Sequence, residues 1–247
     1  MDTYESAKAR IWAAQRPDDA AIGFTGAPDV MRRLAEAPGR RLTFGPGGEY
    51  HADAGRRVGP LGDIATTAEM RRSLPHDVTN ALAAAAMVLE SGLADTAAIT
   101  EALASFDGPA HRLERLGILD GVEWYNDSKA TTPHAAAVAI HAFDDIVLIA
   151  GGKDKHVDLA EMAVERERIR AVIAIGETRE AVVAAFDGVD VVETTEFLPA
   201  AVARAAELAR PGHTLLLSPG CASLDQYRSF EARGEHFREL AQQQGVC

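Results

Sequence analysis

The chain has 247 residues, of which 47% are hydrophobic, and its formal net charge at pH 7 is -12. This length suits two ordinary domains with a substantial core, and the acidic surface argues against a nucleic-acid partner. The two cysteines, Cys221 and Cys247, form no CxxC pair, so neither a disulfide framework nor a structural zinc site is expected.

The first hundred residues predict a mixture of helices and strands. In chain order these are helix Tyr4–Ala14, strand Ala20–Phe24, helix Val30–Glu36 and strand Arg41–Phe44. The stretch 45–62 is rich in glycine and charge, and we expect a surface excursion with weak strands. Asp77 is expected to cap a helix that ends at Glu90, and Thr96 to cap a second helix that ends at Ser105.

Turn residues at Phe106–Ala110 indicate a domain boundary, which divides the chain into residues 1–109 and 110–247. Immediately after it, two strand patterns, Arg112–Leu119 and Val122–Tyr125, flank Asp120-Gly121. This dipeptide favours the two-residue turns of β-hairpins. The second domain is therefore expected to open with a hairpin.

From Pro133 onward, apolar strands alternate regularly with amphipathic helices. The predicted elements are helix Pro133–Ala142, strand Ile146–Ala150, helix Leu159–Val164, strand Ala171–Ile175, helix Arg179–Phe186, strand Val189–Val192, helix Leu198–Ala209 and strand Thr214–Leu217. Such alternation predicts an α/β fold with a mainly parallel, Rossmann-like sheet covered on both faces. Ligands of these sheets bind beyond the carboxyl ends of the strands.

Three loops at such strand ends carry polar residues. If the chain stays extended from Asn126 to Thr131, alternate side chains place Asp127, Lys129 and Thr131 along one edge. The glycine loop 151–156 adds Lys153 and Lys155. The loop 218–223 has small residues that leave backbone N–H groups uncovered before a helix that follows Asp225. Each loop alone could be only a turn, but together they predict a cleft for a phosphorylated or carboxylated ligand.

Several familiar signatures are missing from the sequence. It contains neither a G-x-x-x-x-G-K-[ST] phosphate loop nor a G-x-G-x-x-G motif, which argues against a free-standing ATPase and a dinucleotide dehydrogenase. The lack of H-E-x-x-H and G-x-S-x-G argues against metalloproteases and α/β-hydrolases. The longest apolar stretch, Ala81–Leu89, is shorter than the roughly 20 residues that span a bilayer, and no leader follows Met1. We therefore expect a cytoplasmic protein without a membrane partner.

Taken in order, these loops and their neighbours resemble one protein family. The motifs are His111-Arg-Leu-Glu114, Asn126-Asp-Ser-Lys-Ala-Thr131, Gly151-Gly-Lys-Asp-Lys155 and the long run from Leu216 through SPGCASLDQYRSF to Glu231-Ala-Arg-Gly-Glu235. The sequence is similar to the Mur ligases, and within them to the branch that adds D-glutamate. The resemblance implies the remainder of a central ATP-binding domain at 1–109 and a C-terminal domain at 110–247. It also implies that Met1 aligns inside the central domain, because the family's UDP-sugar domain and phosphate loop have no counterpart in this sequence.

The resemblance further implies an activity. Members of the family form an amide with ATP and Mg²⁺, and this branch adds D-glutamate to UDP-N-acetylmuramoyl-L-alanine through an acyl phosphate during peptidoglycan synthesis, which supports cell shape and division. We expect a monomeric, ADP-forming ligase by ancestry, and no activity from this chain on its own. The alternative is a non-catalytic module that binds D-glutamate or a nucleotide.

Individual site residues follow from the same resemblance. Lys8 matches a lysine that is carbamylated in the family and helps to hold magnesium, although an ordinary solvated lysine is the alternative. The positions that match nucleotide contacts are Asn80, Arg112, Asp127 and Lys129, whereas Asp77 stands where a second asparagine is usual. The positions that match D-glutamate contacts are Thr131, Lys155, Ser223, Leu224 and Phe230.

Overall fold

The computed structural model describes the backbone of residues 2–246 and the side chains of residues 5–246. Met1 and Cys247, which figure in the expectations above, lie outside the described residues. The chain forms two compact units, Met1–Asp107 and Gly108–Cys247. The division falls within the turn Phe106–Ala110, two residues before the position drawn from the sequence.

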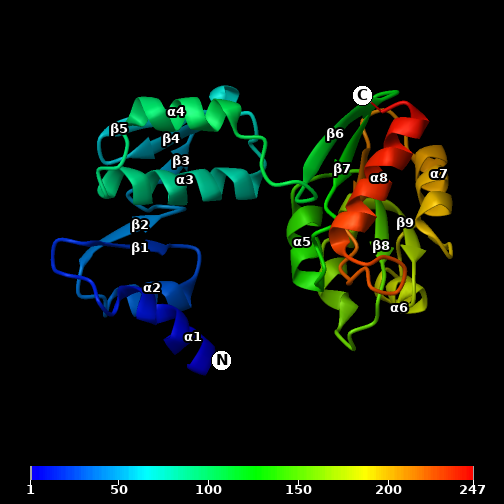
Figure 1. Cartoon of the computed structure of the whole chain (residues 1–247), viewed down its shortest axis with the longest axis horizontal. Coiled ribbons are helices and arrows are strands. Elements are labelled where there is room, and N and C mark those ends of the chain that lie inside the picture. Colours follow the sequence, from blue (N-terminus) through cyan, green and yellow to red (C-terminus); the bar gives the residue numbers. More distant parts are fainter. Residues whose placement is uncertain (1, 247) are drawn as a thin grey trace. The chain divides into compact units, whose positions relative to one another are not determined.

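The first unit contains two small sheets (Figure 1). Strands β1 (Ala20–Phe24) and β2 (Arg40–Phe44) pair in parallel, and β3 (His51–Asp53), β4 (Arg56–Gly59) and β5 (Gly62–Thr66) form an antiparallel sheet. The glycine-rich excursion is thus more ordered than expected, and β5 extends beyond it. The helices and 3₁₀ turns are α1 (Asp2–Ala9), η1 (Arg10–Trp12), α2 (Pro28–Leu34), η2 (Thr67–Glu69), α3 (Pro75–Glu90) and α4 (Thr96–Ser105).

Both expected helix caps in this unit are wrong by position. The cap of α3 is Leu74, and Asp77 lies in the first turn, where its carboxylate accepts a 3.2 Å hydrogen bond from the Leu74 N–H. In α4 the cap is Asp95, whose Oδ1 accepts a 2.9 Å bond from the N–H of Ala98. The physical reason is the same in both cases: a carboxylate can satisfy a free N–H from either side of the first turn.

The second unit has one six-stranded sheet with the strand order β10-β9-β8-β11-β7-β6. Its strands are β6 (Glu114–Leu119), β7 (Val122–Asn126), β8 (Ile146–Gly151), β9 (Ile169–Ile175), β10 (Val191–Thr194) and β11 (Thr214–Leu217). All neighbours are parallel except the β6–β7 hairpin, which confirms the predicted fold class. Asp120 and Gly121 both have positive φ, +50° and +78°, as a type I′ turn requires.

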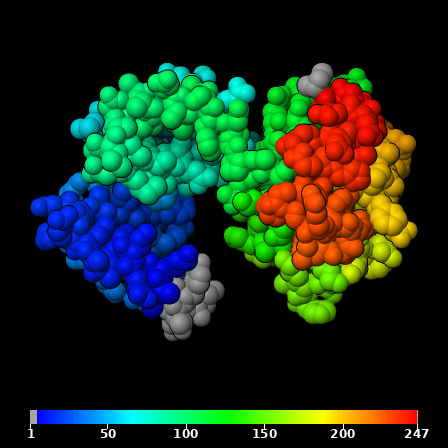
Figure 2. Space-filling view, in the orientation of Figure 1, coloured from blue at the N-terminus to red at the C-terminus, as the bar shows by residue number. Residues whose placement is uncertain are grey.

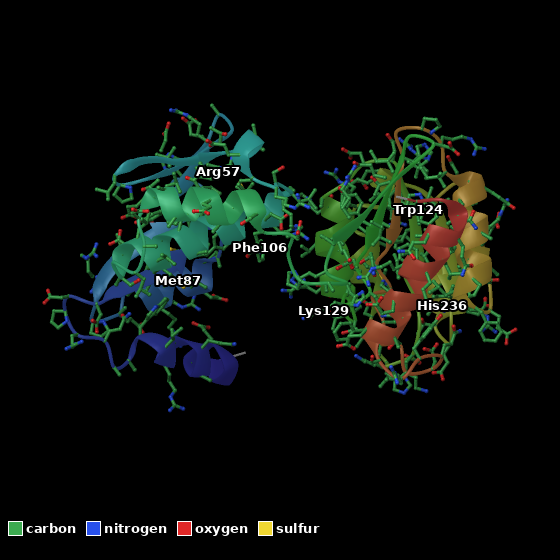
Figure 3. All side chains as sticks on the ribbon, turned by 45° about the horizontal axis from the view of Figure 1, so that its top comes forward. Arg57, Met87, Phe106, Trp124, Lys129 and His236 are labelled. Atoms are coloured by element: carbon green, nitrogen blue, oxygen red, sulfur yellow. The ribbon has the colours of Figure 1, made fainter. Side chains whose placement is uncertain are left out.

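Helices cover both faces of this sheet. They are α5 (Pro133–His141), α6 (Arg179–Ala185), α7 (Leu198–Leu208) and α8 (Phe230–Gln244), with 3₁₀ turns η3 (Leu159–Ala163) and η4 (Arg166–Arg168). Helices α7 and α8 share a core with Val147, Ile149 and Trp124, which is labelled in Figure 3. The Trp124 ring stacks on Phe237 of α8. Figure 2 shows the outer side of α8 exposed across this face.

The opposite face is covered by α5, α6 and η3. Strand β8 is buried throughout, and side chains alternate along a strand, so Leu148 points away from the core that contains Val147. Helix α6 contacts β8, β9 and β10, and both α5 and α6 contact η3. The expected α-helix at Leu159–Val164 is instead the five-residue 3₁₀ turn η3, because five residues barely exceed one helical turn.

Within residues 2–246, no helix combines the length and the apolar composition that crossing a membrane requires.

Candidate functional site

The loop after β7 turns instead of staying extended. The Ala130 N–H donates to the Asp127 carbonyl at 2.9 Å, and the Thr131 N–H donates to the Lys129 carbonyl at 2.8 Å. Asp127 is only 5% exposed, whereas Lys129 lies on the surface. The expected shared edge of Asp127, Lys129 and Thr131 is therefore wrong. Between Asp127 and Lys129 the chain turns toward the interior, where the buried Ser128 hydroxyl donates a 2.8 Å hydrogen bond to the Phe230 carbonyl.

Asp127 joins three segments of the second unit. Its Oδ1 accepts a 3.1 Å hydrogen bond from the Leu113 N–H, and its Oδ2 accepts a 2.8 Å bond from the Ser218 hydroxyl. Hydrogen bonds to an ionised group are stronger than those between neutral groups. The carboxylate thus fixes the start of β6 and the ends of β7 and β11 relative to one another.

The turn before β6 presents Arg112 to solvent. Its neighbours His111 and Leu113 are buried, and both have positive φ, +60° and +43°. Non-glycine residues rarely adopt this conformation, so the surrounding contacts must hold it. One such contact is the 3.0 Å hydrogen bond from the Lys129 N–H to the His111 carbonyl. Arg112 and Lys129 are therefore carried by backbone segments that contact each other.

The glycine loop after β8 needs its two glycines for close backbone approach. A Cβ at Gly151 would lie 2.2 Å from the Ile175 carbonyl oxygen, and a Cβ at Gly152 would lie 2.2 Å from that of Ala222. The Lys153 N–H donates to the same Ala222 carbonyl at 2.8 Å. The loops after β8 and β11 are consequently bonded to each other, directly before Ser223.

The lysines of these loops have different partners. Lys155 Nζ lies 3.4 Å from the Thr131 carbonyl oxygen, and Lys129 Nζ lies 5.7 Å from the centre of the Phe230 ring. Lys153 Nζ instead forms a 2.8 Å ion pair with Glu177. Of the two cations that the sequence indicates in the glycine loop, Lys155 is thus the one beside Thr131.

The remaining acceptor-site residues lie in the segment between β11 and α8. Ser223 is 2% exposed, and its carbonyl accepts a 2.8 Å bond from the Tyr227 N–H, whereas Leu224 is 66% exposed. Helix α8 begins only at Phe230, where Ser229 caps it through the Ala232 N–H. The small-residue loop is therefore separated from the helix terminus by a further turn.

Two predicted site residues belong to the first unit. Lys8 lies on α1, where it lines a groove of about 610 Å³ with Trp12 and Val30, and Asn80 is exposed on α3. The carboxylate of Glu5 beside Lys8 accepts hydrogen bonds from Arg32 and Arg33.

The described residues around Lys8 contain no preformed cluster of metal ligands. No group of three or more His, Cys, Asp and Glu side chains that could hold a metal ion occurs among them. Mg²⁺ prefers several oxygen ligands in octahedral geometry, and Glu5 is already committed to arginines. The role of Lys8 in holding magnesium therefore stays a prediction.

Asp77, which stands at an asparagine position of the family pattern, is held by cationic neighbours. Its Oδ1 lies 3.1 Å from Arg72 Nε and 3.3 Å from His76 Nε2. Burial opposes ionisation of the carboxyl group, but hydrogen bonds and charges from His76 and Arg72 outweigh this effect and lower the pKa of Asp77. The carboxylate stabilises the start of α3.

Two buried residues of the second unit were missed at the level of sequence. Asn126 donates to Gly234 O at 3.1 Å, and its Oδ1 accepts a 3.2 Å bond from the Ser128 N–H. Arg233 of α8 bonds to the loops after β7 and β11. Both lie within the long motifs, and an arginine in an otherwise apolar helix stripe is the signal that could have indicated Arg233.

Comparisons with known proteins agree with this arrangement. Residues 111–221 match the family model described as "Mur ligase, glutamate ligase domain". The UDP-N-acetylmuramoylalanine–D-glutamate ligase of Myxococcus xanthus is 39% identical over 97% of this chain and 55% of the relative. The enzyme of the same name from Frankia casuarinae is 38% identical over 95% of this chain and 52% of the relative. The chain spans about half the length of these curated relatives.

Solved structures show the same fold at low sequence identity. The UDP-N-acetylmuramate-alanine ligase of Thermotoga maritima superposes with a TM-score of 0.66 at 17% identity, covering 98% of this chain and 55% of the other. A pseudomurein peptide ligase type C from Methanothermus fervidus gives a TM-score of 0.67 at 13% identity, covering 97% and 59%.

The fold and the three joined loops define the second unit as a Mur ligase-type C-terminal domain. The chain belongs to the Mur ligase family, and the curated relatives that it matches over nearly its whole length are its D-glutamate-adding members.

Proposed function

We propose that this chain contributes the amino-acid acceptor site and part of the nucleotide contacts of an ATP-dependent ligase that joins D-glutamate to UDP-N-acetylmuramoyl-L-alanine. The product is a peptidoglycan precursor, so the activity serves cell-wall synthesis, and with it cell shape and division, in the cytoplasm. In this reaction the D-glutamate amine attacks the acyl phosphate of the L-alanine carboxyl group. A carbon–nitrogen bond forms, the bond from carbon to the phosphate oxygen breaks, and inorganic phosphate leaves.

The observation that carries the proposal is the meeting of three strand-end loops at one edge of the sheet. Lys155 reaches the Thr131 carbonyl, and the backbone of Lys153 bonds to that of Ala222 beside Ser223. A lysine ammonium and loop N–H groups are suited to the two carboxylates of glutamate, because charge-assisted hydrogen bonds are the strong ones. In the proposed site Thr131, Lys155, Ser223, Leu224 and Phe230 contact D-glutamate.

The nucleotide contacts are proposed on the adjoining segment. Arg112 and Lys129 are exposed cations on backbone segments that share a hydrogen bond, and they would neutralise phosphate charge. Asp127 accepts hydrogen bonds from the Leu113 N–H and the Ser218 hydroxyl, which hold that segment in place, and we propose it as the contact to the ribose. Asn80 is the nucleotide contact that we propose on the first unit.

A second candidate function is binding of D-glutamate without catalysis. It is favoured by one sequence observation, the lack of a phosphate loop to cradle the γ-phosphate, since phosphoryl transfer depends on such positioning. In the ligase, by contrast, the residues named above would bind and orient ATP and D-glutamate.

Isothermal titration of the chain with D-glutamate tests the acceptor site. We expect saturable binding of D-glutamate and at least tenfold weaker binding of L-glutamate, because an L-glutamate that keeps both carboxylate contacts must point its amine in a different direction. Equal affinity for both enantiomers, or no heat with either, would contradict the proposal. An ADP-release assay with UDP-N-acetylmuramoyl-L-alanine, D-glutamate and ATP then separates the ligase from the binding module.

A further inference from the structure

Arg233 of α8 is buried against two of the three loops. It is 1% exposed, its Nε donates to the Ser128 hydroxyl at 3.0 Å, and its Nη2 donates to the Ser128 carbonyl at 2.9 Å. The same Nη2 donates to the Cys221 carbonyl at 3.1 Å. One guanidinium group therefore bonds to the loop after β7 and to the loop after β11.

The third loop touches the remaining nitrogen of this group. A Cβ built on Gly152 would lie 3.2 Å from Arg233 Nη1, so the glycine leaves the space in which the guanidinium sits. Nη1 has no hydrogen-bond partner among the described residues. Because β8, β11 and β7 are consecutive in the sheet, Arg233 spans the ends of three neighbouring strands.

Burying this side chain has an energetic cost. Burial lowers the pKa of Arg233 to about 10, although the nearby carboxylates of Asp225 and Asp127 oppose this shift. A buried charge of this kind is weak evidence for stability, since apolar residues of similar volume often stabilise a fold as well or better. A planar fork with fixed donor directions is, however, well suited to holding separate backbone segments in register.

We propose that Arg233 is a positioning residue that holds the loops after β7, β8 and β11 in the relative arrangement that D-glutamate binding requires. The identity of the ligand rests on the proposed function, whereas the role of Arg233 in holding the loops together does not. Ser128 lies next to Lys129 and three residues before Thr131, and Cys221 lies two residues before Ser223. A shift of Ser128 would therefore move Lys129 and Thr131, and a shift of Cys221 would move Ser223.

The test uses hydrogen exchange of the whole chain, read by mass spectrometry, with two substitutions at this position. Arg233→Met keeps most of the volume and removes every donor, and Arg233→Lys restores a cation without the fork. The control is Arg204→Met, which removes a partly exposed arginine of α7 that pairs with Glu193 of β10 in the same unit.

We expect hydrogen exchange in segments 126–132 and 218–225 to become at least tenfold faster in Arg233→Met than in the wild type. In Arg233→Lys, the exchange rates of these segments should lie between those of the wild type and of Arg233→Met. Exchange in β9 should stay unchanged, and the control should leave both loop segments as in the wild type. D-Glutamate affinity should fall at least tenfold in Arg233→Met and recover in part in Arg233→Lys. A residue that only stabilises the unit as a whole would accelerate exchange in β9 as well.

Wild-type exchange in both loops of folded Arg233→Met would overturn the inference, and so would uniform acceleration throughout the unit. If Arg233→Met does not fold, Ser128→Ala removes one anchor and is judged by the same two segments. Failure of the wild-type chain to bind D-glutamate would refute the proposed ligand, while the exchange measurement would still decide whether Arg233 braces the loops.

Discussion

The Ser218 hydroxyl donates a 2.8 Å hydrogen bond to Asp127 Oδ2, across 91 residues of sequence. Both side chains are buried, at the carboxyl ends of the neighbouring parallel strands β11 and β7. The bond therefore fixes the two strand ends from which the proposed nucleotide and acceptor contacts extend.

Replacing Ser218 with alanine tests the strength of this bond. We expect the free energy of unfolding of the second unit to fall by about 1.5–3 kcal/mol, since the lost bond is to a charged group in a buried site. In a Trp12→Phe background, Trp124 is the single tryptophan and reports urea unfolding of this unit. The control is Thr194→Ala at an exposed position of β10 in the same unit, which should change stability by less than about 0.5 kcal/mol. Equal values for both variants would show that the bond contributes nothing.

A methyl group on Gly234 should disturb His111. The added Cβ would lie 2.3 Å from Nδ1 and 2.7 Å from Cγ of this buried ring. Alanine is about 1 kcal/mol better than glycine inside a helix, but overpacking typically costs about 1–3 kcal/mol, so we expect Gly234→Ala to destabilise. In a His111→Ala background the same substitution should become neutral or stabilising. A double-mutant cycle by urea unfolding measures both, and additivity would contradict the clash.

The two lysines of the glycine loop should differ in their effect on ligand binding. Lys155→Ala removes the cation beside Thr131, and we expect D-glutamate binding to weaken roughly 10- to 100-fold, as loss of a charge-assisted contact implies. Lys153→Ala is the matched control, because its ammonium already pairs with Glu177. Titration calorimetry of both variants gives the comparison. If Lys153→Ala weakened binding more than Lys155→Ala, the assignment of Lys155 to the D-glutamate site would be wrong.

Asp77 makes the stability of the first unit depend on pH in a defined direction. Its pKa in the folded state is lowered from the ordinary value of 3.8, so the folded state favours the carboxylate. The stability it contributes is present above about pH 4 and is lost as the pH falls through the folded-state pKa. Asp77→Asn should therefore be about 1 kcal/mol less stable than the wild type at pH 7. Urea unfolding followed by circular dichroism should show this difference shrinking below pH 3.8; growth of the difference on acidification would disprove it.

Much of the second unit could be predicted because its signals are local. The continuous apolar run Ile146–Gly151 indicates a strand buried on both faces, and Asp120-Gly121 specifies a hairpin by its backbone preference alone. The elements that were missed depend on competition between partners. Asp77 and Asp95 could each satisfy a helix N-terminus from more than one position, and the short segment Leu159–Ala163 adopts a 3₁₀ turn that apolar periodicity does not distinguish from an α-helix.

The sequence by itself determined the order of strands and helices, the mainly parallel sheet and the three strand-end loops, because apolar periodicity and turn chemistry act over a few residues. Only the tertiary structure decided which polar side chains face inward. Asp127 is buried while Lys129 is exposed, and Arg233 meets Ser128 across 105 residues. Which side chains are buried depends on whether their hydrogen-bond donors and acceptors find partners, and those partners can lie far away in the sequence. A local sequence pattern contains no information on such distant partners.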